Sequence, residues 1–125
     1  MRAATVARGL GVVRVGIGTG LLLMPGFAGR IWIGEHADGP GTRVFARAIG
    51  ARDVVLGSRA LLSQREGLPL RRWMRLEVAI DVGDAVATAL ASRHLTRGRR
   101  VAMPLIAAGY AAASWVVAES IDDGD

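Results

Sequence analysis

Val101-Ala-Met-Pro-Leu-Ile-Ala-Ala-Gly-Tyr-Ala-Ala-Ala-Ser-Trp-Val-Val-Ala118 is the stretch of this chain that decides the fold class. It runs for 18 residues without a charged side chain. A hydrocarbon core about 30 Å thick is crossed by roughly 20 mostly apolar residues in a helix. The stretch therefore predicts a membrane-spanning helix over about residues 100–119. Pro104 falls in the first turns of this helix, where proline is tolerated.

Three further segments of similar length precede this stretch, at about residues 5–24, 42–64 and 70–92. Pro25-Gly26 ends the first, and Gly67-Leu68-Pro69 opens the third, because proline and glycine interrupt helices. Gly39-Pro40-Gly41 precedes the second, where Thr42 is the expected N-cap. Segment lengths and breakers together predict an all-α fold, with no strand-like alternation to compete.

The composition agrees with one membrane domain over residues 1–125. The chain is 51% hydrophobic with a mean hydropathy of +0.33, and Trp32, Trp73 and Trp115 fall near expected helix ends, as in an interfacial belt. We therefore expect a four-helix transmembrane bundle with both termini on the same side, a multi-pass protein of the cell membrane. Arg14 interrupts the first apolar segment, so we expect a retained helix rather than a signal peptide.

Residues 42–64 fit a membrane span less well, because Arg52 and Asp53 lie in the middle of the segment and cannot reach the headgroups. Arg43, Arg47, Arg52, Asp53 and Arg59 point in several directions on a helical wheel, so no clean solvent face emerges. A soluble or peripheral helical bundle is the alternative. Six arginines lie near the membrane side expected to hold the termini, and six lie near the opposite side. The positive-inside rule therefore leaves the orientation of the bundle in the membrane open.

The net charge of +5 raises nucleic acid as a partner, but no aromatic stacking surface accompanies the arginines. Membrane lipids with anionic headgroups are the expected counter-charge. The chain has no cysteine, which excludes a disulfide framework and a cysteine metal site. We expect no metal and no cofactor, and we interpret His36 and His94 as solvated loop residues.

An acidic stripe lies on the third segment, where Glu77, Asp81 and Asp84 stand at i, i+4 and i+7 on one helical face. Counted at about 1.5 Å per residue from the side of the termini, charges on three segments reach similar depths of about 10–15 Å. A charge facing lipid at the bilayer centre costs roughly 2.5–3.5 kcal/mol. These groups should therefore face protein or water, or some of the acids should be protonated. The predicted internal polar cluster comprises Arg14, Arg52, Asp53, Glu77, Asp81 and Asp84.

Three functions stay open for such a cluster. It can hold the bundle together in a non-enzymatic protein that binds a lipid or hydrophobic small molecule. It can serve an intramembrane acid–base enzyme of the isomerase or cyclase type, with Asp81 and Asp84 sharing a proton. It can belong to a small transport or accessory subunit that needs a homo-oligomer or a partner membrane protein. No serine has a nearby histidine base, so we expect no nucleophile.

Glycines predict where helices approach closely. Gly16-Ile-Gly-Thr-Gly20 has the small-x-x-x-small spacing of packed membrane helices. Gly50 and Gly57 flank Asp53 on its own face, which also indicates packing.

Three features follow one another in the middle of the chain: Gly50-Ala-Arg-Asp-Val-Val-Leu-Gly57, an arginine-rich turn and Asp81-Val-Gly-Asp84. In these features the chain resembles a family of small multi-pass membrane proteins of unknown function found in actinobacteria and fungi. Its members combine a Gly-x-Arg-Asp-x-x-x-Gly helix with a following helix that bears an aspartate. The resemblance covers about residues 46–94. It implies a site at Arg52, Asp53 and one or both of Asp81 and Asp84, and it implies no reaction, cofactor or partner.

Overall fold

The computed structural model describes residues 2–63 and 69–121, and their regular structure is entirely helical, with no strand. These ranges hold five α-helices and two 3-10 helices. In chain order they are α1 (Arg2–Leu23), α2 (Pro25–Ile33), η1 (Gly34–Asp38), α3 (Pro40–Leu62), α4 (Leu70–Ala91), η2 (Ser92–His94) and α5 (Arg97–Glu119). The all-α prediction is confirmed, and the expected number of four helices is wrong.

The additional helix is α2, which lies where the sequence predicted a connection. Pro25 ends α1 as expected, but it also occupies the first turn of a new helix. Proline suits that position because the first N–H groups of a helix have no intrahelical acceptor. Gly34 then ends α2 with a φ of 70°, and its N–H donates to the carbonyl oxygen of Arg30.

The helix boundaries differ from the predicted ones by a few residues. α1 and α5 each begin three residues earlier than expected, so Pro104 lies inside α5. Thr42 is not the N-cap of α3, because Gly39 takes that position and Pro40 follows in the first turn. The expected end of the second segment at Gln64 and its following turn through Leu68 lie outside the described residues.

Two antiparallel helix pairs form the molecule, and the first pair joins α1 to α3 along a seam of glycines. A Cβ on Gly18 would lie 2.6 Å from the carbonyl oxygen of Gly50, and a Cβ on Gly11 would lie 2.9 Å from that of Gly57. Only glycine allows this approach of two backbones. Gly16 was also expected at a helix contact, but no atom of another helix lies within 4 Å of a Cβ placed on it.

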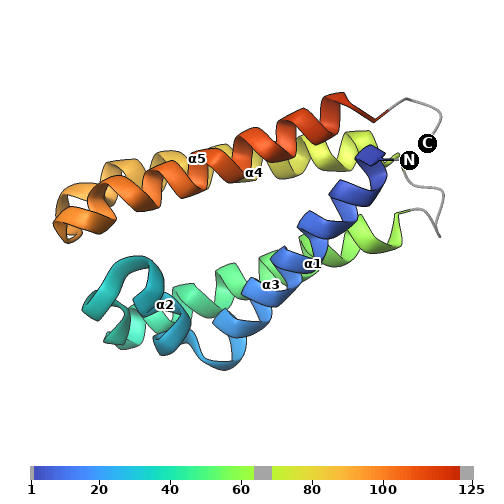
Figure 1. Ribbon diagram of the computed structural model, residues 1–125. Helices are drawn as coiled ribbons and strands as arrows, with labels where there is room; N and C mark the ends of the chain where they lie inside the picture. The colour runs from blue at the N-terminus through green and yellow to red at the C-terminus, as the bar shows by residue number, and fades with distance from the viewer. Residues whose placement is uncertain (1, 64–68, 122–125) are drawn as a thin grey trace.

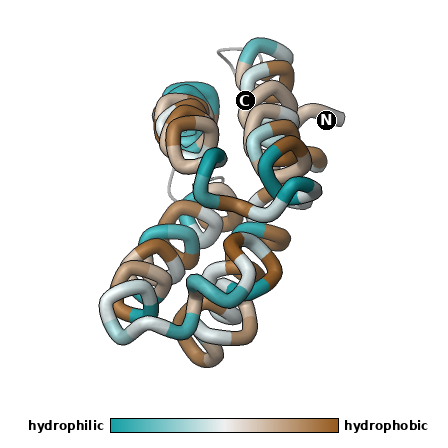
Figure 2. The backbone as a smooth tube through the Cα atoms, turned by 90° about the vertical axis from the view of Figure 1, so that its left-hand side faces the viewer, coloured by the Kyte–Doolittle hydropathy of each residue, from teal (hydrophilic) through white to brown (hydrophobic). Residues whose placement is uncertain are grey.

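The second pair joins α4 to α5, and the two pairs converge at the end of the molecule where α1 begins and α5 ends (Figure 1). At that end a small apolar cluster packs residues of three helices and the segment after α5: Ala4, Ala7, Leu70, Met74, Val117, Ala118 and Ile121. Figure 2 views the molecule from the other end, where the two pairs stand apart and hydrophobic residues are distributed along every long helix. The described ends of the first and last helices therefore lie on one side, as expected.

By length and composition, two described helices can cross a membrane. They are Ala3–Leu23, with a hydropathy of 1.5, and Arg97–Glu119, with a hydropathy of 1.7. α3 and α4 do not meet this measure because both carry several charges. A bundle of four membrane spans therefore stays a prediction, and it requires that the charges of α3 and α4 be shielded from lipid.

Candidate functional site

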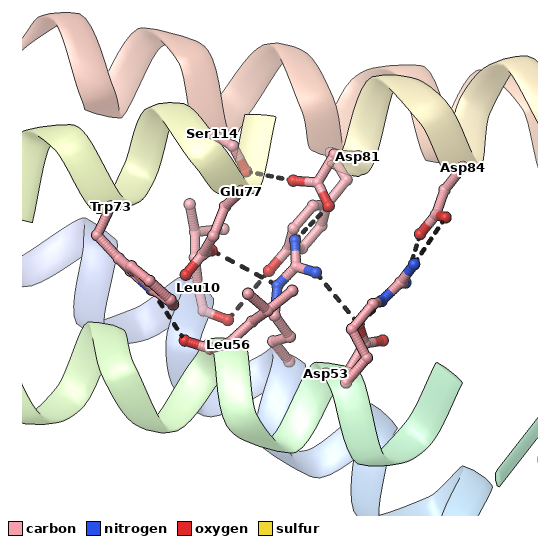
Figure 3. A network of polar contacts seen from close by, with 11 residues as sticks. Leu10, Asp53, Leu56, Trp73, Glu77, Asp81, Asp84 and Ser114 are labelled. Atoms are coloured by element: carbon pink, nitrogen blue, oxygen red, sulfur yellow. Dashed lines mark hydrogen bonds and ion pairs between the residues drawn. The ribbon is translucent and has the colours of Figure 1, made fainter. Parts of the chain in front are cut away.

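Arg14 of α1 is the centre of a buried ionic network between the two helix pairs. Its side chain is only 4% exposed. Nη1 donates to Oδ1 of Asp53 at 3.2 Å, Nη2 donates to Oδ1 of Asp81, and Nε lies 3.6 Å from Oε2 of Glu77. Figure 3 shows these three acids converging from α3 and α4. One guanidinium thus joins three helices.

The glycine seam explains why Arg14 and Asp53 meet. Gly11, Arg14 and Gly18 stand at i, i+3 and i+7, so they share one face of α1. Asp53 occupies the same position between the glycines of α3, and α3 runs antiparallel to α1. The close approach of the two backbones therefore sets Arg14 and Asp53 opposite each other at the middle of the seam.

α5 contributes two residues that the sequence analysis did not include. The ring centroid of Tyr110 lies 5.0 Å from the guanidinium carbon of Arg14, and its hydroxyl donates to the carbonyl oxygen of Leu10 at 3.0 Å. Ser114 is fully buried, and its Oγ donates to Oδ2 of Asp81 at 3.0 Å. Their spacing could have indicated their role. They are the only hydroxyl residues between positions 101 and 118 of the sequence, and at i and i+4 they share one face of the helix.

Arg52 and Asp84 form a second ion pair at the edge of the network. Nη1 and Nη2 of Arg52 donate to the two carboxylate oxygens of Asp84 at 3.0 and 2.6 Å, and Nη2 also donates to Asp53 at 3.1 Å. The Arg52 and Asp84 side chains are 31% and 46% exposed. All six predicted side chains therefore meet in one network, in which Arg52 and Asp84 lie at the partly exposed edge.

Asp81 and Asp84 do not share a proton in this arrangement. Asp81 accepts hydrogen bonds from Arg14 and Ser114, whereas Asp84 accepts both of its hydrogen bonds from Arg52. Their side chains point toward different arginines, although they stand only three residues apart (Figure 3). The idea of an Asp81–Asp84 acid pair is therefore wrong.

Glu77 is the least satisfied member of the network. It is 1% exposed, and its Oε1 has no hydrogen-bond partner, nor has Nε of Arg14. The neighbouring indole N–H of Trp73 donates to the carbonyl oxygen of Leu56 at 3.4 Å. The ring of Trp73 also packs on the guanidinium of Arg59, with 5.4 Å from the ring centroid to the guanidinium carbon.

The network holds more acids than bases. It contains the two arginines Arg14 and Arg52 and the four carboxyl groups of Asp53, Glu77, Asp81 and Asp84. If every group were ionised, its formal charge would be 2 − 4 = −2. Among the described residues there is no group of three or more His, Cys, Asp or Glu able to hold a metal ion.

A shallow groove on the α4–α5 pair is the second candidate site. It encloses about 290 Å³. Its lining is apolar and made mostly of small side chains: Val78, Val82, Ala85, Val86, Ala108, Ala111, Ala112 and Trp115. Val78, Val82 and Val86 follow each other at four-residue spacing on a face of α4 turned away from the acidic one, because each step along a helix rotates about 100°.

The end of the molecule opposite the termini is rich in arginine. Arg30 binds both carboxylate oxygens of Asp38, and this guanidinium holds the pKa of Asp38 below its ordinary value. Arg99 of α5 donates to the carbonyl oxygens of Arg30 and Ile31, which ties α5 to the end of α2. His36 and His94 are exposed in the two 3-10 helices, as expected for solvated residues.

Comparison of the chain with protein-family models, with curated proteins and with solved structures found no match.

Proposed function

We propose that this protein is a small multi-pass membrane protein. Its Arg14-centred network fastens two helix pairs together inside the bilayer, and its α4–α5 groove holds an apolar chain of a lipid or another hydrophobic small molecule. One observation carries the proposal, namely that the polarity of the molecule is reversed relative to a soluble bundle.

Large apolar side chains are exposed on every long helix, while four ionisable side chains are buried. Examples of the former are Ile17, Phe45, Leu90, Leu105 and Val116, each at least half exposed. The buried groups are Arg14, Asp53, Glu77 and Asp81, at 1–8% exposure. Soluble proteins rarely expose large contiguous apolar surfaces and almost never bury charges at this density. An apolar solvent around the four long helices accounts for both features.

The charges of α3 and α4 are compatible with such a solvent. Each long helix has 22 or 23 residues, which gives about 33 Å at 1.5 Å per residue and matches a hydrocarbon core. Asp53 and Asp81, near the middles of α3 and α4, are buried and paired with Arg14. Arg52 and Asp84 pair with each other at a partly exposed edge of the network. The low hydropathy of α3 and α4 therefore does not argue against spanning.

The network supplies polar contacts between helices, which are needed in a bilayer because apolar packing there has no hydrophobic effect to drive it. Lipid tails are as apolar as leucine, so helices in membranes associate through close packing and polar contacts instead of the hydrophobic effect. The glycine seam joins α1 to α3, but the two pairs pack on each other mainly at one end. Arg14 and Tyr110 add hydrogen bonds between the pairs beyond that end, and Ser114 binds Asp81 within the second pair.

The groove fits an apolar chain better than a polar ligand. Its volume of about 290 Å³ is at the lower end of the roughly 300–1,000 Å³ found for small-molecule pockets. Its lining offers no ionisable side chain. An acyl chain or a similarly slender apolar molecule satisfies both constraints.

Trp115 lines the groove and can report on its occupant. With Trp32 and Trp73 replaced by Phe, Trp115 becomes the only indole of the chain. The protein is placed in phosphatidylcholine vesicles with brominated or with unbrominated acyl chains. We expect the brominated chains to quench most of the Trp115 fluorescence.

Two neighbouring substitutions give the matched control. Ala112→Phe fills the groove and should clearly reduce the quenching of Trp115. Ala113→Phe adds the same ring at an exposed position that does not line the groove, and should leave the quenching unchanged. Equal fluorescence in the two vesicle types would refute the membrane proposal. Equal quenching in both Phe variants would refute the groove as a chain-binding site.

A further inference from the structure

The excess of acid in the buried network needs a compensating positive charge. Around Arg14 alone, one buried cation faces the three buried carboxyl groups of Asp53, Glu77 and Asp81. An unpaired charge in a low-dielectric interior costs several kcal/mol, whereas a neutral carboxyl group costs far less. The described residues offer no metal site that could supply the positive charge. A proton on one of the acids would supply this charge.

The hydrogen bonds distinguish the three acids from one another. Asp81 accepts a bond on each oxygen, from Arg14 and from Ser114. Oδ1 of Asp53 accepts from both Arg14 and Arg52. Donors on these oxygens stabilise the ionised forms, because a carboxylate is an acceptor only.

Glu77 has the opposite surroundings. Its Oε1 has no hydrogen-bond donor, and the approach of Arg14 Nε to Oε2, at 3.6 Å, is too long for a hydrogen bond. It is also the most buried of the three acids, at 1% exposure. A carboxylate there would be unsolvated, with no hydrogen-bond donor and only a long ion pair with Arg14, and a neutral carboxyl group avoids the larger part of this cost.

We propose that Glu77 is a proton-binding site, and that the protein holds this carboxyl group neutral in the folded state at pH 7. With Glu77 neutral, Arg14 is balanced by Asp81. The formal charge of the network then falls from −2 to −1, and the remaining charge is that of Asp53, which accepts hydrogen bonds from both Arg14 and Arg52. The inference deepens the proposed function and rests on it in one respect, since an apolar surrounding keeps bulk water from solvating the network.

Every helix of the two pairs presents a charged or titratable group to this site. α1 presents Arg14, α3 presents Asp53, α4 presents Asp81, and α5 presents the phenol of Tyr110. Loss of the proton would therefore place a new carboxylate beside Asp81, in competition for the same guanidinium. Ionisation of Glu77 would weaken the contact that fastens the two helix pairs.

Infrared spectroscopy tests the proposal directly. The carbonyl stretch of a protonated carboxylic acid is separate from that of a carboxylate. We expect the purified protein in detergent at pH 7 to show this band. Glu77→Gln, a neutral isostere of the protonated acid, should lose it and keep the helical circular dichroism of the parent protein. Glu35→Gln, which removes an exposed acid of η1, should keep the band unchanged.

Three results would overturn the proposal. They are an absent band in the parent protein, a band that persists in Glu77→Gln, and failure of Glu77→Gln to fold, since a neutral residue should be tolerated where a neutral acid stands. The test is independent of the groove. A Trp115 signal that brominated lipid does not quench, together with the expected infrared band, would refute the proposed function and leave the proton site in place.

Discussion

Arg14 can join three carboxyl groups because a guanidinium presents five N–H donors in a rigid planar fork. Each of its three nitrogens faces a different acid, and its flat face packs on Tyr110. A lysine at this position would offer a single point charge. Removing the guanidinium leaves buried acids without their shared cation, which is among the most destabilising changes known for buried ion pairs.

Arg14→Gln should therefore lower the free energy of unfolding by about 3–5 kcal/mol, or prevent accumulation of the protein. Arg97→Gln, at an exposed position at the start of α5, should change it by less than about 0.5 kcal/mol. Both values are measured by denaturant titration in mixed micelles. A change for Arg14→Gln as small as that for Arg97→Gln would show that the network does not hold the bundle.

The charged members of the network could be predicted at the residue scale, and its hydroxyl members could not. Depth along each segment brought Arg14, Asp53 and Asp81 to similar levels, because helical rise is nearly constant. Tyr110 and Ser114 lie in an apolar stretch where a hydroxyl carries no charge signal. Only the packing of α5 against α4 and α1 shows that these hydroxyls have partners.

At the scale of elements, the seam between α1 and α3 depends on which glycines face each other. Gly11 and Gly18 meet Gly57 and Gly50, at a spacing of seven residues in both helices. The expected pair of Gly16 and Gly20 has an equally good helical spacing. A sequence pattern fixes which residues share a face, but the partner helix decides which face is the contact.

Gly18→Ala and Gly16→Ala give a matched comparison within α1. The first places a methyl group against the backbone of α3 and should cost about 1–3 kcal/mol of unfolding free energy. The second meets nothing within 4 Å, and Ala should stabilise the helix by about 0.5–1 kcal/mol. The unfolding titration used for Arg14→Gln measures both. Equal effects of the two substitutions would refute the glycine seam.

At the scale of the whole molecule, four spanning helices would put the two ends of the bundle on opposite sides of a membrane. Pro69 and Ser120 lie at the end where the helix pairs converge, and His36 and His94 lie at the other. The chain has no cysteine, so single-cysteine variants carry no background.

A membrane-impermeant thiol reagent added to one side of sealed vesicles should label Pro69→Cys and Ser120→Cys as one group. His36→Cys and His94→Cys should behave as a second group that is labelled from the opposite side of the membrane. The reagent should reach only one of the two groups until it is given access to both sides. Labelling of all four variants from one side would contradict a four-span arrangement.

The helical class, the four long segments and the acids and arginines that meet are predictable from the amino-acid sequence, because they follow from helical period, segment length and the cost of isolated charge. The short helix α2 is not predictable in this way, since Pro25 can both end one helix and begin the next. The pairing of α1 with α3, the edge position of Asp84 and the unsatisfied Oε1 of Glu77 are visible only in the folded molecule. Each of these depends on which helix faces which, and a pattern along one chain does not contain that information.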